Sequence, residues 1–213
     1  MQGAISDLVG ALGPIDVLVC NAGIGAYGPL VTSSPDTAEQ LMRTNYLGSV
    51  NAVRSVVPQM LDRKRGHIVF VGSIAGRLGV PLEAAYSASK FAVSGLADAL
   101  SVELGAGGIG VTLVSLGPVA TDFFDTRGVP YRRRWPRPLA PDRVAAAIIR
   151  SVERGQHEIV RPRLLRVALV ARGVVPGLYR RGLVRSSRSE LAVFESGQNA
   201  ALCRGEHEDL GPH

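Results

Sequence analysis

The stretch Gly66–Thr121, GHIVFVGSIAGRLGVPLEAAYSASKFAVSGLADALSVELGAGGIGVTLVSLGPVAT, places a helical pattern between two apolar runs rich in β-branched residues. The runs, Gly66–Gly76 and Gly110–Thr121, are each typical of a buried strand that ends in a turn. The helical pattern begins near Glu83 and meets a glycine cluster near Gly105, which is a typical helix stop. A strand, a crossover helix and a second strand predict two parallel strands of one sheet.

The same alternation extends in both directions along the chain. IDVLVCNAG (Ile15–Gly23) predicts an earlier buried strand, and HEIVRP (His157–Pro162) predicts a short later one. One helix opens at the N-cap Ser34 and runs toward Met60, and another covers Ala140–Gly155. The order β-α-β-α-β-α-β predicts an α/β fold with a Rossmann-like, doubly wound parallel sheet.

Length and composition favour one domain. The 213 residues, of which 46% are hydrophobic, are enough for one sizeable core. We expect this domain over residues 1–185 and a polar, loosely ordered tail over residues 186–213. Because no apolar run is long enough to span a bilayer and no signal peptide begins the chain, we expect a cytoplasmic protein. Cys20 and Cys203 have no metal-ligand spacing, so the sequence predicts no metal site.

The positive charge is concentrated late in the chain. The net charge is +6, and most of the excess lies in Tyr131–Arg137 and Arg161–Arg188. Because no basic stripe interleaves with aromatic residues, we expect no nucleic-acid partner. The pattern after Arg161 has two interpretations: a pair of short helices that cover the substrate cleft, or an amphipathic segment that touches a membrane. We favour the first, because two glycines and a proline interrupt the pattern.

Tyr86 and Lys90 are four residues apart, so both lie on one face of the predicted helix. The chain has five tyrosines, only two lysines and otherwise arginine among its basic side chains, so a lysine here indicates a need for a compact ammonium. A nearby cation lowers the pKa of a phenol from about 10 toward working pH. We therefore expect Tyr86 to exchange a proton with an alcohol or carbonyl oxygen.

Three strand ends are predicted to meet at the carboxyl edge of the sheet, where open α/β sheets bind ligands. Ser73 follows one buried strand, and its hydroxyl can donate to a substrate oxygen. Asn21–Gly23 ends the preceding strand, where Gly23 permits close backbone approach. Leu116–Thr121 ends the following strand.

Five short motifs share one family pattern: NAG (Asn21, Ala22, Gly23), TNYLG (Asn45), GSIAG (Ser73), YSASK (Tyr86, Lys90) and GPVAT (Gly117, Pro118, Val119, Thr121). With them the sequence resembles the short-chain dehydrogenase/reductase family over roughly residues 5–165. The resemblance implies that Tyr86 is the general acid/base and that Lys90 lowers its pKa and holds the nicotinamide ribose. It implies that Ser73 orients the substrate and that Asn45 anchors a proton-relay water. The NAG and GPVAT residues, with the tyrosine and the lysine, are the implied cofactor contacts.

The resemblance implies an oxidoreductase that interconverts an alcohol and a carbonyl, with NAD or NADP as cofactor. In the family, specificity comes from the loop after GPVAT and from the C-terminal segment, here residues 123–138 and 161–185. Their mixture of aromatic, apolar and arginine side chains suits a hydrophobic small-molecule alcohol or ketone. The resemblance also implies a homo-oligomer, either a dimer or a tetramer. The alternative is a non-catalytic chain that serves as a binding or dimerisation partner.

The sequence departs from the family pattern in three places. Cys20 stands where the family often has another asparagine, and Leu116 stands where a proline is usual. The sequence also contains no glycine-rich turn of the kind that cradles a pyrophosphate at a helix N-terminus. We therefore expect a truncated, C-terminal portion of the family's fold, with an open apolar sheet edge at Asp16–Cys20 and weak binding of a dinucleotide.

Overall fold

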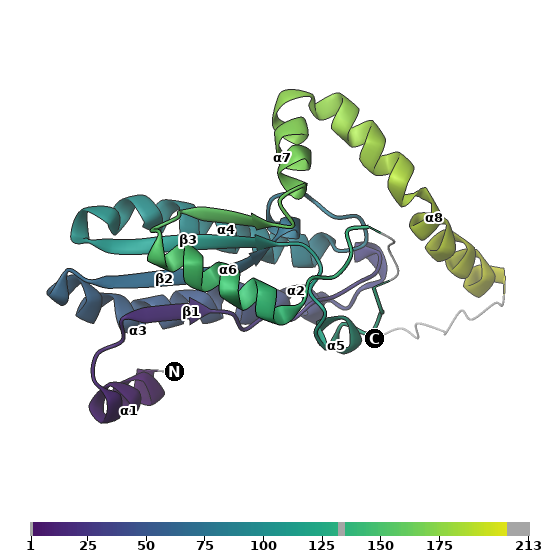
Figure 1. Cartoon of the computed structure of the whole chain (residues 1–213). Helices are drawn as coiled ribbons and strands as arrows, with labels where there is room; N and C mark the ends of the chain where they lie inside the picture. The colour runs from purple at the N-terminus through teal and green to yellow at the C-terminus, as the bar shows by residue number, and fades with distance from the viewer. Residues whose placement is uncertain (1, 132–134, 204–213) are drawn as a thin grey trace, which may run out of the picture. The chain divides into compact units, whose positions relative to one another are not determined.

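The computed structural model describes residues 2–131 and 135–203, with side chains over 3–131 and 135–192. It divides into two compact units, one up to Val170 and one from Ala171. The first unit contains the sheet, and the second contains the whole of the last helix (Figure 1). Residues 132–134 of the predicted basic cluster and residues 204–213 of the predicted tail lie outside the described residues.

Four parallel strands form one sheet in the order β1-β2-β3-β4. Their bounds are β1 (Val17–Cys20), β2 (Gly66–Ser73), β3 (Ile109–Leu116) and β4 (Glu158–Arg161). The register pairs Cys20 with Phe70 and Ser73 with Leu116, so the carboxyl ends follow one another along the same edge. The predicted order and the Rossmann-like α/β class are confirmed.

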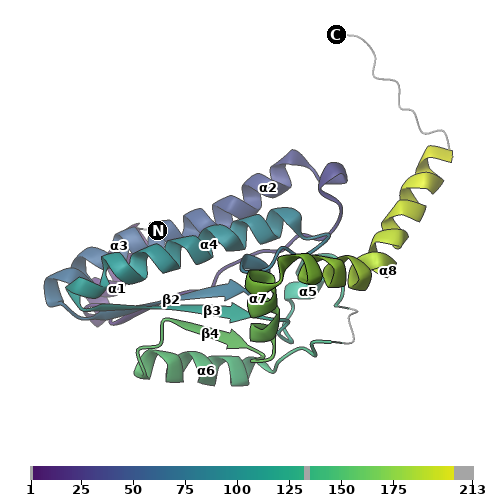
Figure 2. The same ribbon diagram turned by 90° about the horizontal axis from the view of Figure 1, so that it is seen from above.

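Helices cover both faces of the sheet (Figure 2). On one face lies a continuous helical segment made of α2 (Pro35–Leu41), the π-helical turn η2 (Met42–Leu47) and α3 (Gly48–Arg63). The same face also carries α4 (Ala84–Glu103), the helix after β2. The other face carries α6 (Pro141–Glu153). The predicted N-cap is confirmed, because the Ser34 hydroxyl accepts a hydrogen bond from the Asp36 amide.

The remaining elements are short, except for the first helix and the last two. They are α1 (Gln2–Leu12), the 3-10 turns η1 (Leu30–Thr32), η3 (Ile74–Gly76) and η4 (Gly105–Gly107), and the helices α5 (Phe123–Thr126), α7 (Leu165–Val174) and α8 (Pro176–Cys203). Helix α1 packs on α3.

The core consists of a layer on each face of the central strands. In β2, Ile68 and Phe70 pack toward α3 and α4, whereas Val69 packs toward α6. Successive residues of a strand face opposite sides, so a strand covered on both faces is apolar throughout. This is why β2 and β3 are recognisable in the sequence as predominantly apolar runs.

Strand β1 is the less covered side of the sheet. Among the described residues it pairs only with β2. Leu18 and Cys20 pack against the core on the α3 face, whereas Val17 and Val19 point the other way and are 45% and 46% exposed. The expected apolar edge is therefore present.

The second unit differs from the sequence-based expectation. The pattern after Arg161 forms a ten-residue α7 and a 28-residue α8 rather than two short helices, and α8 continues through Ser186 to Cys203. Pro176 occupies the first turn of α8, where proline is favoured, and no glycine or proline occurs from Leu183 to Ser196. The expected loosely ordered tail is therefore helical as far as Cys203. No helix within the described ranges combines the length and apolar character needed to cross a bilayer.

Candidate active site

Helix α4 places Tyr86 and Lys90 one turn apart on its buried side. The Lys90 ammonium donates a hydrogen bond to the backbone carbonyl of Val71, near the end of β2, at 3.1 Å. The next turn of chain, at Gly76, comes so close to α4 that an added Cβ would lie 2.5 Å from the Lys90 carbonyl oxygen. The second glycine of GSIAG is therefore required for the close packing that brings β2 and α4 together.

Gly23, Asn45 and Lys90 meet at one point. A Cβ added to Gly23 would lie 3.1 Å from Asn45 Oδ1 and 3.2 Å from Lys90 Nζ. These residues come from the loop after β1, from η2 and from α4. The absence of a Cβ thus lets Asn45 and Lys90 pack closely against the backbone, in line with the close approach predicted for Gly23 of the NAG motif.

The Asn45 side chain is fully used in holding this loop. Its Oδ1 accepts from the Ile24 amide at 2.8 Å, and its Nδ2 donates to the Ile24 carbonyl at 3.0 Å and to Ser89 Oγ at 2.9 Å. The Ser49 hydroxyl donates to the Asn45 carbonyl. The carboxamide thus connects the loop after β1 to α4. Its role in a proton relay stays a prediction. Sequence reasoning missed Ser89, the middle serine of YSASK.

Ser73 and Tyr86 also lie together. Ser73 forms the last position of β2, and its Oγ accepts a hydrogen bond from the Ala75 amide at 3.1 Å. Its hydroxyl also lies 3.5 Å from the Leu116 carbonyl oxygen, to which it donates. The Ser73 side chain is near enough to the Tyr86 phenol to oppose, in part, the larger effect of burial on the pKa of Tyr86. The serine and the tyrosine are thus neighbours at the carboxyl end of β2.

Burial dominates the electrostatics of this pair. Removal from water raises the pKa of Tyr86 to about 12, against the smaller opposing effect of Ser73. Burial also lowers the pKa of Lys90 to about 8. The expectation that Lys90 brings the pKa of Tyr86 down toward working pH is therefore wrong for this structure, because the ammonium is hydrogen-bonded to Val71 and both groups are desolvated. At neutral pH Tyr86 is a protonated phenol that can donate a proton.

Aromatic side chains of the loop after β3 line the approach to Tyr86. The Phe123 ring lies 5.7 Å from the Tyr86 ring, measured between centroids. Phe124 and Tyr131 continue the series, with centroid distances of 5.6 Å and 5.1 Å between successive rings. The predicted specificity loop therefore does reach Tyr86, through Phe123, whereas Trp135 is exposed.

A buried ion pair fastens this loop to the start of α4. Arg127 Nη1 donates to Glu83 Oε1 at 2.5 Å, and their side chains are only 5% and 13% exposed. The guanidinium also stacks over the rings of Tyr27 and Phe124, 4.8 Å from each centroid. No motif in the sequence indicated this pair, since its partners are 44 residues apart and neither has a distinctive neighbourhood.

The GPVAT residues form the turn from β3 to α5. Gly117 donates to the Arg161 carbonyl at 2.7 Å, and a Cβ there would lie 3.0 Å from Leu165 Cδ1. Pro118 and Val119 pair with Leu139, and Thr121 Oγ1 accepts from the Phe123 amide at 3.4 Å. Among the contacts of the described residues, this turn reaches Tyr86 through Phe123. Of the NAG motif, Asn21 and Ala22 are exposed beside Gly23.

The arrangement suits a ligand that bears hydroxyl groups. An ammonium has three N–H donors, and Val71 uses one of those on Lys90. Within the described part of the chain the other two have no protein acceptor. The ammonium lies next to Gly23, and Tyr86, one helical turn before Lys90, and Ser73 add two hydroxyl groups nearby. These groups are hydrogen-bond donors of the kind that bind hydroxyl-bearing ligands.

Comparisons with known proteins identify the family of this chain. The family described as short chain dehydrogenase matches residues 1–129. Dehydrogenase/reductase SDR family member 7B of Bos taurus is 32% identical over 198 residues, which cover 89% of this chain and 61% of the relative. The 3-ketodihydrosphingosine reductase of Bacteroides thetaiotaomicron is 39% identical over 129 residues, 61% of this chain and 48% of the relative. The chain thus spans between about half and three fifths of the length of these curated relatives.

A solved structure extends the likeness to the fold. A short-chain dehydrogenase/reductase from Burkholderia phymatum in complex with NAD superposes with a TM-score of 0.73 at 26% identity. The superposition covers 81% of this chain and 70% of that one. Because the family match covers more than half of the sequence and includes Asn45, Ser73, Tyr86 and Lys90, the chain belongs to the short-chain dehydrogenase/reductase family.

Proposed function

We propose that this protein is an NAD(P)-dependent oxidoreductase that interconverts an alcohol and a carbonyl, with Tyr86 as the group that gives and takes the proton. One observation carries the proposal: a buried, protonated phenol lies beside the Ser73 hydroxyl and one helical turn from the buried Lys90 ammonium. A structural role alone does not account for a buried ammonium that has no carboxylate partner among the described residues, because burying such a charge is costly.

In the reduction direction, the Ser73 hydroxyl donates a hydrogen bond to the carbonyl oxygen of the substrate. As negative charge develops on that oxygen, Tyr86 transfers its proton to it and becomes a phenolate. The Lys90 ammonium, one helical turn away, serves to hold the cofactor's ribose rather than to lower the pKa of Tyr86. In the oxidation direction the same groups act in reverse, and the phenolate accepts the alcohol proton.

The cofactor that this chemistry requires supplies or accepts the hydride when it is bound. The two remaining donors of Lys90 suit the hydroxyl groups of the ribose at the nicotinamide end. The related structure from Burkholderia phymatum contains NAD, which supports the assignment. Since the sequence has no glycine-rich phosphate turn, we place the contacts of this chain at the nicotinamide riboside end.

We further propose that the substrate is a hydrophobic ketone or alcohol. The rings of Phe123 and Phe124 follow Tyr86 along the loop, and Ala26, Val80 and Ala85 pack around the same cluster. These side chains offer apolar area and no fixed charge to a bound ligand. The Bacteroides thetaiotaomicron relative is by name a reductase of 3-ketodihydrosphingosine, which is consistent with such a substrate.

We also propose a cytoplasmic homodimer that pairs through the outer face of α4. Ala88, Phe91, Gly95 and Ala99 lie on that face and are exposed. Small side chains allow two copies of a helix to approach closely across a two-fold axis. Light scattering at micromolar concentration tests this, and a well-folded monomer contradicts it.

The experiment for the proposed function has two parts. Steady-state turnover is measured with a panel of hydrophobic ketones and with saturating NADH or NADPH. We expect the wild type to turn over at least one ketone, and we expect Ser73→Ala to lower that turnover about tenfold or more. Absence of turnover with every ketone and both cofactors contradicts the proposal. Calorimetry then compares NADH with reduced nicotinamide mononucleotide, and we expect dissociation constants within about threefold of each other. An NADH affinity more than about tenfold higher shows that these residues do contain a phosphate or adenine site.

A further inference from the structure

The strongest feature outside the active site is the charge of the segment Arg161–Ser189. These residues include eight arginines and no aspartate or glutamate. The rest of the chain has 16 basic and 18 acidic residues, so this one segment accounts for more than the entire net charge of +6. A charge so completely separated from its opposite sign is a binding feature rather than a general requirement for solubility.

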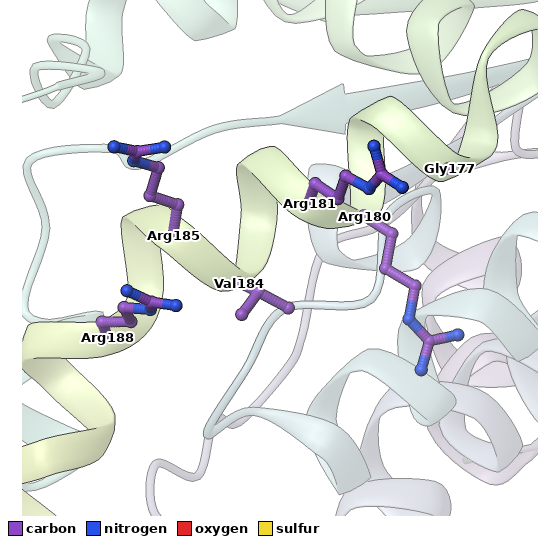
Figure 3. A pocket seen from close by; sticks show the side chains of 6 residues that line it. All are labelled: Gly177, Arg180, Arg181, Val184, Arg185 and Arg188. Atoms are coloured by element: carbon purple, nitrogen blue, oxygen red, sulfur yellow. The ribbon is translucent and has the colours of Figure 1, made fainter.

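Within the second unit, α8 orders part of this charge into a stripe. The stripe follows a spacing of three and four residues, which keeps its members on one helix face. A hollow of about 530 Å³ lies along it, and Figure 3 shows the side chains that line it: Gly177, Arg180, Arg181, Val184, Arg185 and Arg188. All six residues are exposed. None of the ion pairs found among the described residues involves these four arginines.

A row of α8 next to the stripe has a different character. Tyr179, Leu183 and Ser187 follow one another at intervals of four residues, and they are the less exposed positions of this part of the helix. The row adjoins the stripe, because Leu183 is three residues from Arg180 and Ser187 is three from Val184. The cations lie on the more exposed part of the helix, and Pro176 and Gly177 do not interrupt it, contrary to the expectation that glycine and proline would break the pattern.

Apolar side chains accompany the stripe. Val184 lies within it and is 50% exposed, and Leu178, three residues before Arg181, is 69% exposed. Guanidinium groups bind phosphate oxygens through paired hydrogen bonds, and adjacent exposed aliphatic side chains gain free energy by entering an apolar phase. A surface that offers both contacts matches the boundary between phospholipid head groups and acyl chains.

We propose that the arginine stripe of α8 binds the surface of a bilayer that contains anionic phospholipids, with the arginines on lipid phosphates and with Leu178 and Val184 inserted at the acyl boundary. Nucleic acid presents phosphates as well. It offers nothing to the exposed leucine and valine, however, and the described part of the stripe has no aromatic side chain on which a base would stack. Of the two partners, only the bilayer offers contacts both to the arginines and to Leu178 and Val184.

The test is co-sedimentation of the 213-residue chain with vesicles. One set is pure phosphatidylcholine and the other contains one third phosphatidylglycerol. We expect binding to the anionic vesicles only, and we expect it to weaken as added salt shortens the Debye length below about 8 Å. The double variant Arg181→Gln/Arg185→Gln is expected to lower the partition coefficient about thirtyfold, since each arginine near an anionic surface contributes about fivefold.

The matched control is Arg150→Gln/Arg154→Gln, which removes the same charge at the same spacing from exposed positions at the end of α6. It is expected to bind as the wild type does. A second variant, Leu178→Ser/Val184→Ser, is expected to lose the part of the binding that resists high salt. Circular dichroism checks that each variant is folded.

Three outcomes overturn the proposal. The first is failure of the wild type to bind anionic vesicles at low salt. The second is an equal loss of binding in the control variant, which assigns the effect to net charge alone. The third is binding to a duplex oligonucleotide at least as tight as to the vesicles, with the same dependence on Arg181 and Arg185, which assigns the stripe to nucleic acid.

Discussion

Arginine serves opposite purposes in the two units of this molecule. Arg127, in the first unit, is almost completely buried, pairs with Glu83 and stacks on two aromatic rings. Arg181 and Arg185, in the second unit, are exposed and take part in none of the ion pairs found among the described residues. A buried charge must be compensated where it lies, because desolvation costs more than a single contact returns. A charge that stays in water needs no compensation and remains available to a partner.

Lys90 follows neither pattern. It is buried like Arg127, but its ammonium has a backbone carbonyl as its acceptor instead of a carboxylate. The lowered pKa reflects the resulting cost to the folded state. The comparison therefore separates a buried cation that a carboxylate compensates, Arg127, from one whose charge remains costly to the fold, Lys90, which suits the role proposed for that lysine above.

The largest effect is expected from Tyr86→Phe, which tests whether the chemistry belongs to the first unit alone. The substitution keeps the ring that packs near Phe123 and removes the transferable proton. We expect turnover to fall by about 10²- to 10⁴-fold while the fold is retained. The control is Tyr179→Phe in α8, the same chemical change in the second unit. An equal loss of turnover in the control would contradict the assignment of the chemistry to the first unit alone.

The next effect concerns stability. Arg127→Met leaves Glu83 as a buried carboxylate without its main partner, and we expect the free energy of unfolding to fall by about 3 kcal/mol. Arg181→Met, the same substitution on α8, is expected to change it by less than about 0.5 kcal/mol. Urea denaturation measures both. The double variant Arg127→Met/Glu83→Gln should regain part of the loss, and a double variant no more stable than Arg127→Met contradicts the buried-pair account.

The effect of Lys90→Met is smaller and opposite in sign. In the folded state the pKa of Lys90 is about 8, against 10.5 for an ordinary lysine. Between these values the unfolded chain binds more protons, so this group makes the free energy of unfolding rise with pH. Below pH 8 the wild type carries the full cost of the buried charge. At pH 7 we therefore expect the variant to be more stable by about 2 kcal/mol, after allowance for its lost hydrogen bond.

The pH series is the decisive part of that experiment. The stability advantage of Lys90→Met should shrink from pH 8 upward and be lost before pH 10.5, because the wild-type amine there is neutral in the folded state and half neutral in the unfolded state. Other titrating groups cancel in the difference between the two proteins. An advantage that does not depend on pH would show that the methionine simply packs better than the lysine.

The smallest effect is expected for Arg181→Gln/Arg185→Gln. With neither cation paired among the described residues, the free energy of unfolding should change by no more than about 0.5 kcal/mol, and turnover of a water-soluble substrate should not change. The difference in the free energy of unfolding between this variant and Arg127→Met directly compares exposed with buried arginines. A destabilisation above about 2 kcal/mol would mean that the stripe has a structural role as well.

The sequence predicts the fold well where burial on two faces is encoded locally. The strands β2 and β3 stand out because most of their positions are buried, and glycine-containing turns mark their ends. The same logic placed Gly23, Ser73 and Leu116–Thr121 at one edge, since they follow neighbouring parallel strands. The start of α2 was equally clear, because Ser34 and the proline after it form a local signal.

The parts that were not predicted depend on packing between distant segments. Glu83 and Arg127 meet only because the loop after β3 folds back over the start of α4. The pKa of Tyr86 depends on how completely its phenol is buried, which no spacing reveals, and so its direction was misjudged. Pro176 was interpreted as a break, although a proline is equally a good first residue, and only the structure distinguishes the two uses.

The π-helical turn η2 makes the site sensitive to the number of residues as well as to their identity. A π-helical turn holds an extra residue, and in this one that widened turn carries Asn45. Deletion of a single residue from Met42–Leu47 would let the segment relax into a regular α-helix with its backbone hydrogen bonds intact. One residue corresponds to about 100° of rotation, so with α3 held by its core contacts the carboxamide would turn away from Ile24. We therefore expect that a one-residue deletion at this place removes the hydrogen bonds between Asn45 and Ile24 in a chain that still folds.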